Sequence, residues 1–319
     1  MGETRKYKVT ILSRSFSACS NEPLELLNRY FEVNLQRNDL PEDTRRIARL
    51  IGDSDGIITG SDVVDRYVMD HCPNLKMISK HGVGLDSIDL ELAKERGIKV
   101  TTTPNANNES VADLTLLLML NILRQLRRNE IHCDTPDWTS KSLANDLYEK
   151  TVALIGFGNI GQAVAHRLQG FSCKLLIYDP CVEPGAFAQE DAVACSFEEA
   201  LRHADIISLH LPLTEKTQKM INRDTISLMK PEAVLINTSR GGIVDEDALY
   251  EALVSRRIRA AGLDVYAQEP PVGNRLLVLD NVVATPHIAT HTQESNYRMG
   301  VAAARNLIDF FSAYEKERN

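Results

Sequence analysis

The sequence predicts an α/β protein that combines two doubly wound parallel-sheet domains in one chain. Strand-like apolar runs alternate with helical segments almost from end to end. A glycine-rich turn at 156–161 opens a second series of such units, and an amphipathic segment follows the last strand. Alternating strands and helices with short connections form a parallel sheet covered on both faces. A chain of 319 residues also exceeds what one hydrophobic core usually serves, which indicates two domains.

The first series of strands is expected at 7–13, 31–36, 55–60, 75–80 and 98–103. The segments between these runs have helical periodicity and carry stop signals such as Gly97. An uninterrupted helix is then expected from about Ser110 to Arg128, capped by Asn108 or Ser110 and ending in a basic turn. The change from short helices to one long helix indicates the end of the first sheet.

The second series of strands is expected at 151–158, 174–180, 204–212, 233–239, 259–266 and 281–286. Six strands with helices between them complete a doubly wound domain. The final helix, 292–314, then needs another surface for its apolar stripe of Met299, Ala302, Ala303, Leu307, Phe310 and Phe311. We expect it to return to the first domain. The predicted domains are residues 1–105 with 291–319, and residues 106–290.

Composition and charge exclude several classes of protein. Hydrophobic residues at 43% and charged residues at 25% are ordinary for a soluble globular protein. The net charge of -8 leaves no basic excess to neutralise phosphates, which argues against nucleic acid as a partner. The longest apolar run, at 114–120, is far shorter than the roughly 20 residues of a membrane span. We therefore expect neither nucleic-acid nor membrane binding.

The cysteines and the N-terminus indicate the cellular compartment. The six cysteines are scattered, with no CxxC pair and no histidine at zinc-site spacing, so reduced thiols and no metal site are expected. The charged N-terminus lacks the apolar core of a secretory signal. Together these features predict a cytoplasmic protein.

The stretch GFGNIG directly follows an apolar strand and opens a helix. Gly156 permits the tight turn, Gly158 permits close approach of a pyrophosphate, and Gly161 permits close packing of helix and strand. The helix N-terminus offers free N–H groups to the phosphates. Asp179 ends the next strand and suits both ribose hydroxyls, while its charge disfavours a 2′-phosphate. The pattern predicts a Rossmann domain that binds NAD rather than NADP.

Three polar side chains follow late strands of this second series: Arg240, Glu269 and His287. Open parallel sheets bind their ligands at the carboxyl ends of the strands. Each residue alone is more often part of a surface ion pair than a catalyst. A cation, a carboxylate and an imidazole at three successive strand ends nevertheless form a set that a 2-oxo acid can use.

Seven stretches, in the same order, resemble signatures of the D-isomer-specific 2-hydroxyacid dehydrogenases, a family that includes 3-phosphoglycerate dehydrogenase and glyoxylate/hydroxypyruvate reductase. They are KHGVGLDSID, TTPNANNESVADLTLLLML, GFGNIG, HLPLT, NTSRGGIVDEDAL, GLDVYAQEP and TPHIA. The resemblance implies a Rossmann NAD-binding domain inserted in a flavodoxin-like substrate domain. It also implies hydride transfer between NAD(H) and C2 of a small D-2-hydroxy acid or 2-oxo acid.

The resemblance assigns roles to individual residues. His287 gives or takes the proton, Glu269 tunes it, and Arg240 binds the carboxylate and carbonyl of the substrate. The backbone N–H groups of Val83 and Gly84 grip the same carboxylate. Asn107 is a candidate substrate contact, although an Asx turn or helix cap explains it nearly as well. The cofactor site takes in, besides the three glycines and Asp179, Asn159, Ile160, Pro212, Thr238 and Asp264, the last as acceptor for the nicotinamide carboxamide.

Several alternatives stay open at this point. The best-known phosphoglycerate dehydrogenases carry an arginine where this chain has Gly60, which puts a direct phosphate clamp in doubt, but compact relatives of similar pattern keep that activity open. Asp113 replaces a usual glutamate, and the ATHT stretch after His287 is bulkier than usual. A dinucleotide-sensing corepressor keeps the same three polar residues and is the alternative of a different class.

The remaining expectations concern other histidines and assembly. His81 and His291 are further candidates for lining the pocket. The helix after Ser110 and the segment around Trp138 are candidate homodimer contacts, since two-fold dimers are the commonest closed assembly.

Overall fold

The computed structural model describes residues 6–130, 143–181 and 192–318, and its strands form two separate parallel sheets. The chain divides into two compact units. Unit 1 contains Met1–Asn107 and His291–Asn319, and unit 2 contains Asn108–Thr290. The boundaries of these units follow Asn107 and Thr290, and the predicted domain boundaries follow residues 105 and 290.

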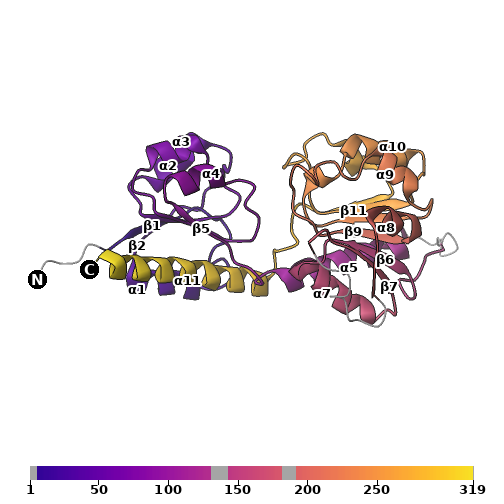
Figure 1. Cartoon of the computed structure of the whole chain (residues 1–319), viewed down its shortest axis with the longest axis horizontal. Coiled ribbons are helices and arrows are strands. Elements are labelled where there is room, and N and C mark those ends of the chain that lie inside the picture. The colour runs from indigo at the N-terminus through magenta and orange to yellow at the C-terminus, as the bar shows by residue number, and fades with distance from the viewer. Residues whose placement is uncertain (1–5, 131–142, 182–191, 319) are drawn as a thin grey trace, which may run out of the picture. The chain divides into compact units, whose positions relative to one another are not determined.

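Unit 1 is built on a five-stranded sheet of order β2-β1-β3-β4-β5 (Figure 1). All of its neighbouring strands are parallel, and this order is that of flavodoxin-like folds. The strands are β1 (Lys8–Ile11), β2 (Glu32–Leu35), β3 (Gly56–Thr59), β4 (Met77–Lys80) and β5 (Lys99–Thr101). The helices are α1 (Glu22–Tyr30), α2 (Thr44–Ile51), α3 (Arg66–His71), α4 (Leu90–Glu95) and α11 (Gln293–Arg318).

Successive residues of the unit 1 strands face opposite sides of the sheet. Ile57 and Ile78 pack with α2, α3 and α4, whereas Ile58 and Met77 pack with α1 and α11. The central strands β3 and β4 are buried at every position, as a sheet covered on both faces requires.

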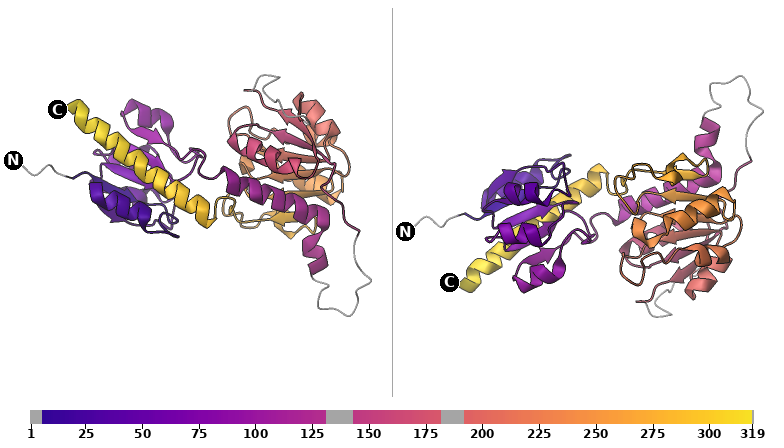
Figure 2. Two further views of the ribbon diagram at one scale, coloured as in Figure 1. Left: turned by 90° about the horizontal axis from the view of Figure 1, so that it is seen from below. Right: turned by 90° about the horizontal axis from the view of Figure 1, so that it is seen from above.

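Helix α11 lies directly on the unit 1 sheet beside α1, as the two views of Figure 2 show. A Cβ atom at Gly56 would lie 3.0 Å from Leu307 and 3.1 Å from Phe311, so the helix approaches β3 without an intervening layer. The Ser79 hydroxyl donates a hydrogen bond to the Ala303 carbonyl at 3.0 Å. Of the predicted stripe, Met299, Ala303, Leu307 and Phe311 are buried, and Ala302 and Phe310 are partly buried.

Unit 2 contains a seven-stranded sheet of order β12-β11-β10-β9-β6-β7-β8, again fully parallel (Figure 1). Read from the β8 edge, the order is β8-β7-β6-β9-β10-β11-β12. If β6 is counted as strand 1, the first six of these strands have the Rossmann order 3-2-1-4-5-6, and β12 is added beside β11. The strands are β6 (Thr151–Ile155), β7 (Lys174–Tyr178), β8 (Ala192–Ala194), β9 (Ile206–Leu209), β10 (Val234–Asn237), β11 (Ala260–Leu263) and β12 (Val282–Ala284).

Helices cover both faces of the unit 2 sheet. Leu154 packs with α5 and α7 on one face, and Ile155 packs with α8, α9 and α10 on the other. The helical elements are α5 (Asn108–Arg124), α6 (Leu126–Glu130), α7 (Asn159–Gln169), α8 (Phe197–His203), α9 (Arg223–Leu228), α10 (Glu246–Val254) and the 3₁₀ turns η1 (Gly241–Ile243) and η2 (Arg275–Val278). No helix in the described ranges is both long and apolar enough to cross a bilayer.

Three expectations about the elements need correction. The unit 2 sheet has a seventh strand, β8, which the sequence did not predict because three partly exposed residues at a sheet edge carry no long apolar run. The expected single helix to Arg128 is interrupted at Gln125, whose φ of 50° ends α5 and separates it from α6. Helix α5 also begins at Asn108, so Ser110 lies inside its first turn. The dimer candidate Trp138 lies outside the described residues.

Candidate active site

The glycine-rich turn joins β6 to α7 at the carboxyl end of the unit 2 sheet. Gly156 has a φ of 102°, and a Cβ atom there would lie 2.7 Å from the backbone carbonyl of His210. A Cβ atom at Gly161 would lie 2.4 Å from the carbonyl oxygen of Gly156. Both positions therefore require glycine for packing of the turn itself.

Gly158 differs from the other two glycines. It is the N-cap of α7, no side chain caps that helix, and a Cβ atom there would meet nothing within 4 Å. The first N–H groups of an 11-residue helix consequently face open space at this point. This open approach to a helix N-terminus fits a dinucleotide pyrophosphate.

Asp179 stands beside this turn, one residue after β7. Its Oδ2 atom accepts the Phe157 N–H at 2.7 Å, and its Oδ1 atom accepts the Cys181 N–H at 2.8 Å. Each carboxylate oxygen keeps a further lone pair for a ligand hydroxyl. The two backbone bonds fix the carboxylate next to the glycine turn, where a ribose of the same dinucleotide fits.

The other predicted cofactor residues have diverse surroundings. Asn159 and Ile160 form the first turn of α7, and Pro212 is exposed after β9. Thr238 is buried and its hydroxyl lies 2.9 Å from that of Thr115 on α5. The side chain of Thr238 therefore joins the end of β10 to helix α5, and its contact with a cofactor stays a prediction.

His287 and Glu269 form a close pair within unit 2. The His287 Nδ1 atom lies 2.6 Å from the Glu269 Oε2 atom, and the two side chains are 48% and 36% exposed. The other oxygen of Glu269 accepts the Tyr266 N–H at 3.0 Å. With Nδ1 engaged by the carboxylate, Nε2 is the atom of His287 that is available to a substrate.

The pair shifts the pKa of each partner toward the charged form. The hydrogen bond to Glu269 raises the pKa of His287 above its ordinary value of 6.5, and burial opposes it. Burial alone would raise the pKa of Glu269, but the hydrogen bond and the charge of His287 bring it below its ordinary value. The site therefore favours an imidazolium beside a carboxylate, which is the state of a proton donor.

Asp264 shapes the backbone around His287. Its fully buried carboxylate accepts hydrogen bonds from the Thr285 hydroxyl at 2.6 Å, the Ile288 N–H at 2.8 Å and the Ala289 N–H at 3.0 Å. The His287 N–H donates to the Asp264 carbonyl at 2.9 Å. These bonds hold His287 at a φ of 52°, a left-handed conformation that is uncommon outside glycine. The contact of Asp264 with a cofactor stays a prediction.

Arg240 follows β10, and its segment packs closely against the loop of Glu269. The Arg240 carbonyl accepts the Asn237 side-chain amide at 2.9 Å, and its guanidinium donates to the Ser239 carbonyl at 2.7 Å. A Cβ atom at Gly241 would lie 1.8 Å from the Tyr266 carbonyl carbon, so the two backbones are in direct contact. The charge of Arg240 also acts on the pKa values of Glu269 and His287.

The predicted substrate residues Val83, Gly84 and Asn107 belong to unit 1. Among the described residues, no hydrogen bond uses the N–H groups of Val83 and Gly84. Asn107 is 3% exposed and its Oδ1 atom has no hydrogen-bond partner among these residues. Its side-chain oxygen therefore makes neither the Asx turn nor the cap that was the alternative reading.

The histidine His81 is also in unit 1, at the end of β4. Its Nδ1 atom lies 3.1 Å from the Ser13 hydroxyl, and its ring packs edge-on against Phe16. Burial lowers its pKa to about 4. His81 is thus a neutral histidine packed inside unit 1, whereas His291 is not buried.

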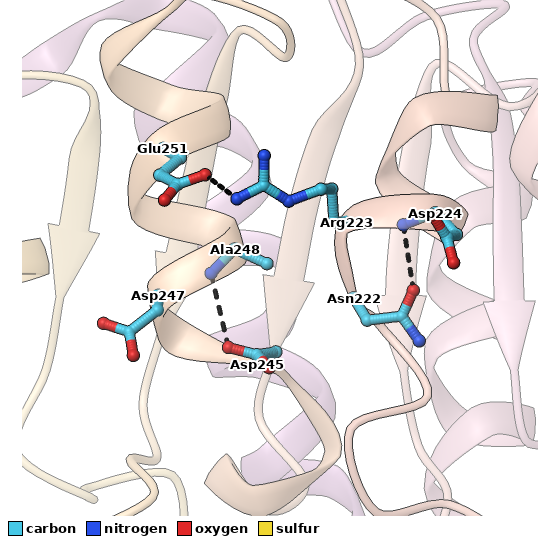
Figure 3. Close-up of a pocket in the computed structure, with 7 residues that line it drawn as sticks. All are labelled: Asn222, Arg223, Asp224, Asp245, Asp247, Ala248 and Glu251. Carbon is cyan, nitrogen blue, oxygen red and sulfur yellow. Dashed lines mark hydrogen bonds and ion pairs between the residues drawn. The ribbon is translucent and has the colours of Figure 1, made fainter.

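An open pocket on the surface of unit 2 contains none of the predicted site residues (Figure 3). It has a volume of about 370 Å³ and lies between α9 and α10. Arg223 pairs there with Glu251, and Lys219 lies 3.1 Å from Asp245. Two of its acidic side chains, Asp245 and Glu251, therefore already have cationic partners.

Two residues that support the loop of Glu269 and the turn of His287 were missed by sequence reasoning, Tyr266 and Glu246. The Tyr266 hydroxyl donates to the Thr285 carbonyl at 2.9 Å, and burial raises its pKa to about 12. The Glu246 carboxylate accepts hydrogen bonds from the loop that carries Glu269. Both lie inside motifs that the sequence singled out, but contacts between two loops distant in sequence leave no periodic signal.

Comparisons with known proteins identify the family of the chain. The model of the family "D-isomer specific 2-hydroxyacid dehydrogenase, NAD binding domain" matches residues 116–289. A hydroxypyruvate reductase of Thermotoga maritima is 41% identical over 297 residues, which cover 90% of this chain and 95% of that protein. A D-3-phosphoglycerate dehydrogenase of Methanocaldococcus jannaschii is also 41% identical, over 90% of this chain but 55% of its own longer chain.

A solved structure with the same fold is the D-lactate dehydrogenase of Aquifex aeolicus, complexed with NAD and lactic acid. It has a TM-score of 0.86, is 30% identical in sequence, and the match covers 96% of each chain. The chain therefore belongs to the D-isomer specific 2-hydroxyacid dehydrogenase family and is an oxidoreductase that uses a nicotinamide cofactor.

Proposed function

We propose that this protein interconverts a small D-2-hydroxy acid and its 2-oxo acid, with His287 as acid and base, Glu269 tuning it and Arg240 binding the substrate. The observation that carries the proposal is the 2.6 Å contact of His287 Nδ1 with Glu269 Oε2. The pair stands at the carboxyl ends of the same sheet as Arg240 and the glycine turn.

The proposed mechanism assigns one task to each residue. The glycine turn and Asp179 would hold NADH, which when bound would supply the hydride for C2 of the substrate. The His287 imidazolium donates its Nε2 proton to the carbonyl oxygen as that oxygen becomes an alkoxide, and Glu269 stabilises the imidazolium beforehand. Arg240 offers its planar fork to the carboxylate and polarises the carbonyl. In the oxidation direction, neutral His287 takes the hydroxyl proton.

The proposed cofactor is NAD rather than NADP. The carboxylate of Asp179 is held beside the glycine turn by two backbone N–H groups. A 2′-phosphate at that ribose would meet this negative charge, whereas a 2′-hydroxyl donates to it.

The proposed substrates are unphosphorylated 2-oxo acids such as hydroxypyruvate and glyoxylate. Gly60 has no side chain that could bind a substrate phosphate. Its N–H donates to the buried Asp62 carboxylate at 3.0 Å, so the charge next to Gly60 is negative. Val83, Gly84 and Asn107 remain the proposed contacts of unit 1 with the substrate.

A second candidate, 3-phosphoglycerate dehydrogenase activity, is favoured by Lys80. This largely buried lysine donates to the carbonyl of Gly60 and to the Ser87 hydroxyl, which puts a cation at the same loop. The charge of Lys80 is the feature that would attract a substrate phosphate.

The decisive experiment measures NADH oxidation with glyoxylate, hydroxypyruvate, pyruvate and phosphohydroxypyruvate. Comparable or better kcat/KM for hydroxypyruvate supports the proposal, and a preference of more than about tenfold for phosphohydroxypyruvate (about 1.4 kcal/mol) selects the second candidate. His287→Ala should lose turnover by about 10²- to 10⁴-fold while NADH binding persists. Full activity in that variant, or no turnover of any 2-oxo acid, contradicts the proposal, and the latter favours a dinucleotide sensor.

A further inference from the structure

Glu246, the first residue of α10, binds the loop that carries Glu269. Its Oε1 atom accepts the Ala267 N–H at 2.8 Å, and its Oε2 atom accepts the Asn274 side-chain amide at 2.8 Å. Glu269 lies between these two attachment points in the sequence. One carboxylate thus closes the 267–274 loop at both ends.

The same carboxylate is rigidly connected to Arg240. The chain runs from Arg240 through η1 to the N-cap Asp245, whose side chain accepts the Ala248 N–H at 3.3 Å. Gly241 in this run packs backbone against backbone on Tyr266 and Ala267. The segment of Arg240 and the loop of Glu269 are therefore joined twice, by a glycine contact and by the Glu246 carboxylate.

We propose that Glu246 is a positioning residue, which holds Glu269 at hydrogen-bonding distance from His287 and in fixed relation to Arg240. The inference rests on the proposed function, because it needs the acid–base role of the Glu269–His287 pair. Glu269 is held by one bond from Tyr266, directly before the 267–274 loop, and by one from His287, in the loop that follows β12. Loss of the Glu246 bonds frees the loop, and small displacements of reacting groups cost rate steeply.

The experiment begins with Glu246→Gln in the full-length protein. The amide keeps an acceptor for the Ala267 N–H but turns a donor toward Asn274. Asn274 cannot simply reverse its own amide, because its Oδ1 atom already accepts the Leu276 N–H at 2.9 Å. We expect kcat for reduction to fall by up to about a hundredfold, with the NADH Kd unchanged.

The pH profile distinguishes positioning from a merely structural role. Charges of Glu269, Asp264 and Arg240 act on His287, and only the Glu269 contact depends on the 267–274 loop. The high-pH limb of reduction in Glu246→Gln should therefore move to lower pH, the direction expected for Glu269→Gln. A change in unfolding temperature alone, with an unmoved limb, overturns the proposal.

Rescue comes from reversing the polarity of the lost bond. In Glu246→Gln/Asn274→Asp the new carboxylate at position 274 can accept both from the amide at 246 and from the Leu276 N–H. Asn274→Asp alone places a second carboxylate against that of Glu246, and its kcat should be lower than that of either other variant. A kcat of the double variant at least tenfold above that of Glu246→Gln supports positioning, and a kcat no higher than that of Glu246→Gln contradicts it.

Asp247→Asn is the matched control, since it removes the neighbouring charge of the same helix. Its exposed side chain lines the surface pocket and makes no hydrogen bond or ion pair with the 267–274 loop, which lies within the described residues (Figure 3). Wild-type kinetics are expected. If Glu246→Gln does not fold, Asn274→Ser replaces it, because the hydroxyl can still cap η2 while the bond to Glu246 is lost.

The two proposals fail in different ways. An unchanged pH profile in Glu269→Gln overturns the proposed function. A shifted profile in Glu269→Gln together with unchanged kcat and profile in Glu246→Gln overturns the positioning role alone.

Discussion

The N–H of His287 donates to the carbonyl of Asp264 at 2.9 Å, while the carboxylate of Asp264 binds the two N–H groups that follow the histidine. One buried aspartate thus sets the backbone of His287, the proposed proton donor, and a different residue, Glu269, orients its ring. Backbone position and proton affinity are separate properties of this site, and they can be changed separately.

Glu269→Gln should alter proton affinity. The Glu269 hydrogen bond raises the pKa of His287, so removing the carboxylate lowers it. Reduction needs the imidazolium and is lost as pH rises through this pKa, so its high-pH limb moves to lower pH. Oxidation needs the neutral ring, so its low-pH limb moves the same way. Initial rates across the pH range in both directions measure this, and limbs that move upward or stay contradict it.

Asp264→Asn should alter the backbone instead. The new amide keeps one acceptor oxygen and replaces the other with an NH2 group, so either the Ile288 or the Ala289 N–H loses its acceptor in a fully buried place. A buried unsatisfied donor costs about 1–3 kcal/mol, and urea unfolding measures it. Asp280→Asn, at an exposed residue paired with Arg256, is the control with little expected change. Equal stability of the two variants speaks against the assigned contacts.

Two glycines of the same turn should respond differently to alanine. Gly158→Ala adds a methyl group to open space at a φ of -68°, so folding stability is expected to hold while NADH affinity falls. Gly161→Ala puts a methyl group 2.4 Å from the Gly156 oxygen and should destabilise the domain by about 1–3 kcal/mol. Thermal unfolding and NADH titration separate the effects. A Gly158→Ala protein that binds NADH normally rules out close approach of the pyrophosphate there.

Asp179→Asn should relax the choice of cofactor. The amide can keep the backbone contacts in part, but the negative charge that opposes a 2′-phosphate is gone. The kcat/KM ratio of NADPH to NADH should rise by about tenfold, or ~1.4 kcal/mol. Asp205→Asn, at a residue paired with Lys230 elsewhere in the unit, is the control. A ratio that does not change assigns the discrimination to other residues.

Features that depend on local sequence patterns could be predicted from the sequence, whereas contacts between loops could not. The glycine turn, Asp179 and the strand ends of Arg240 and His287 were readable because strand, turn and helix follow one another directly. The strand β8 was missed because its residues are few and at an edge. Glu246 was missed because its partners, the Ala267 N–H and the Asn274 side-chain amide, belong to a loop distant in sequence. Tyr266 was missed because its hydroxyl donates to the backbone carbonyl of Thr285, and a backbone partner has no residue-type signature.

The left-handed backbone at His287 has a consequence for engineering. A non-glycine residue held at a φ of 52° costs on the order of 1 kcal/mol or more relative to glycine. A screen that rewards heat resistance alone would therefore favour glycine at position 287 and return sturdy proteins without a proton donor. Selection on turnover must accompany any search for thermostable variants of this domain.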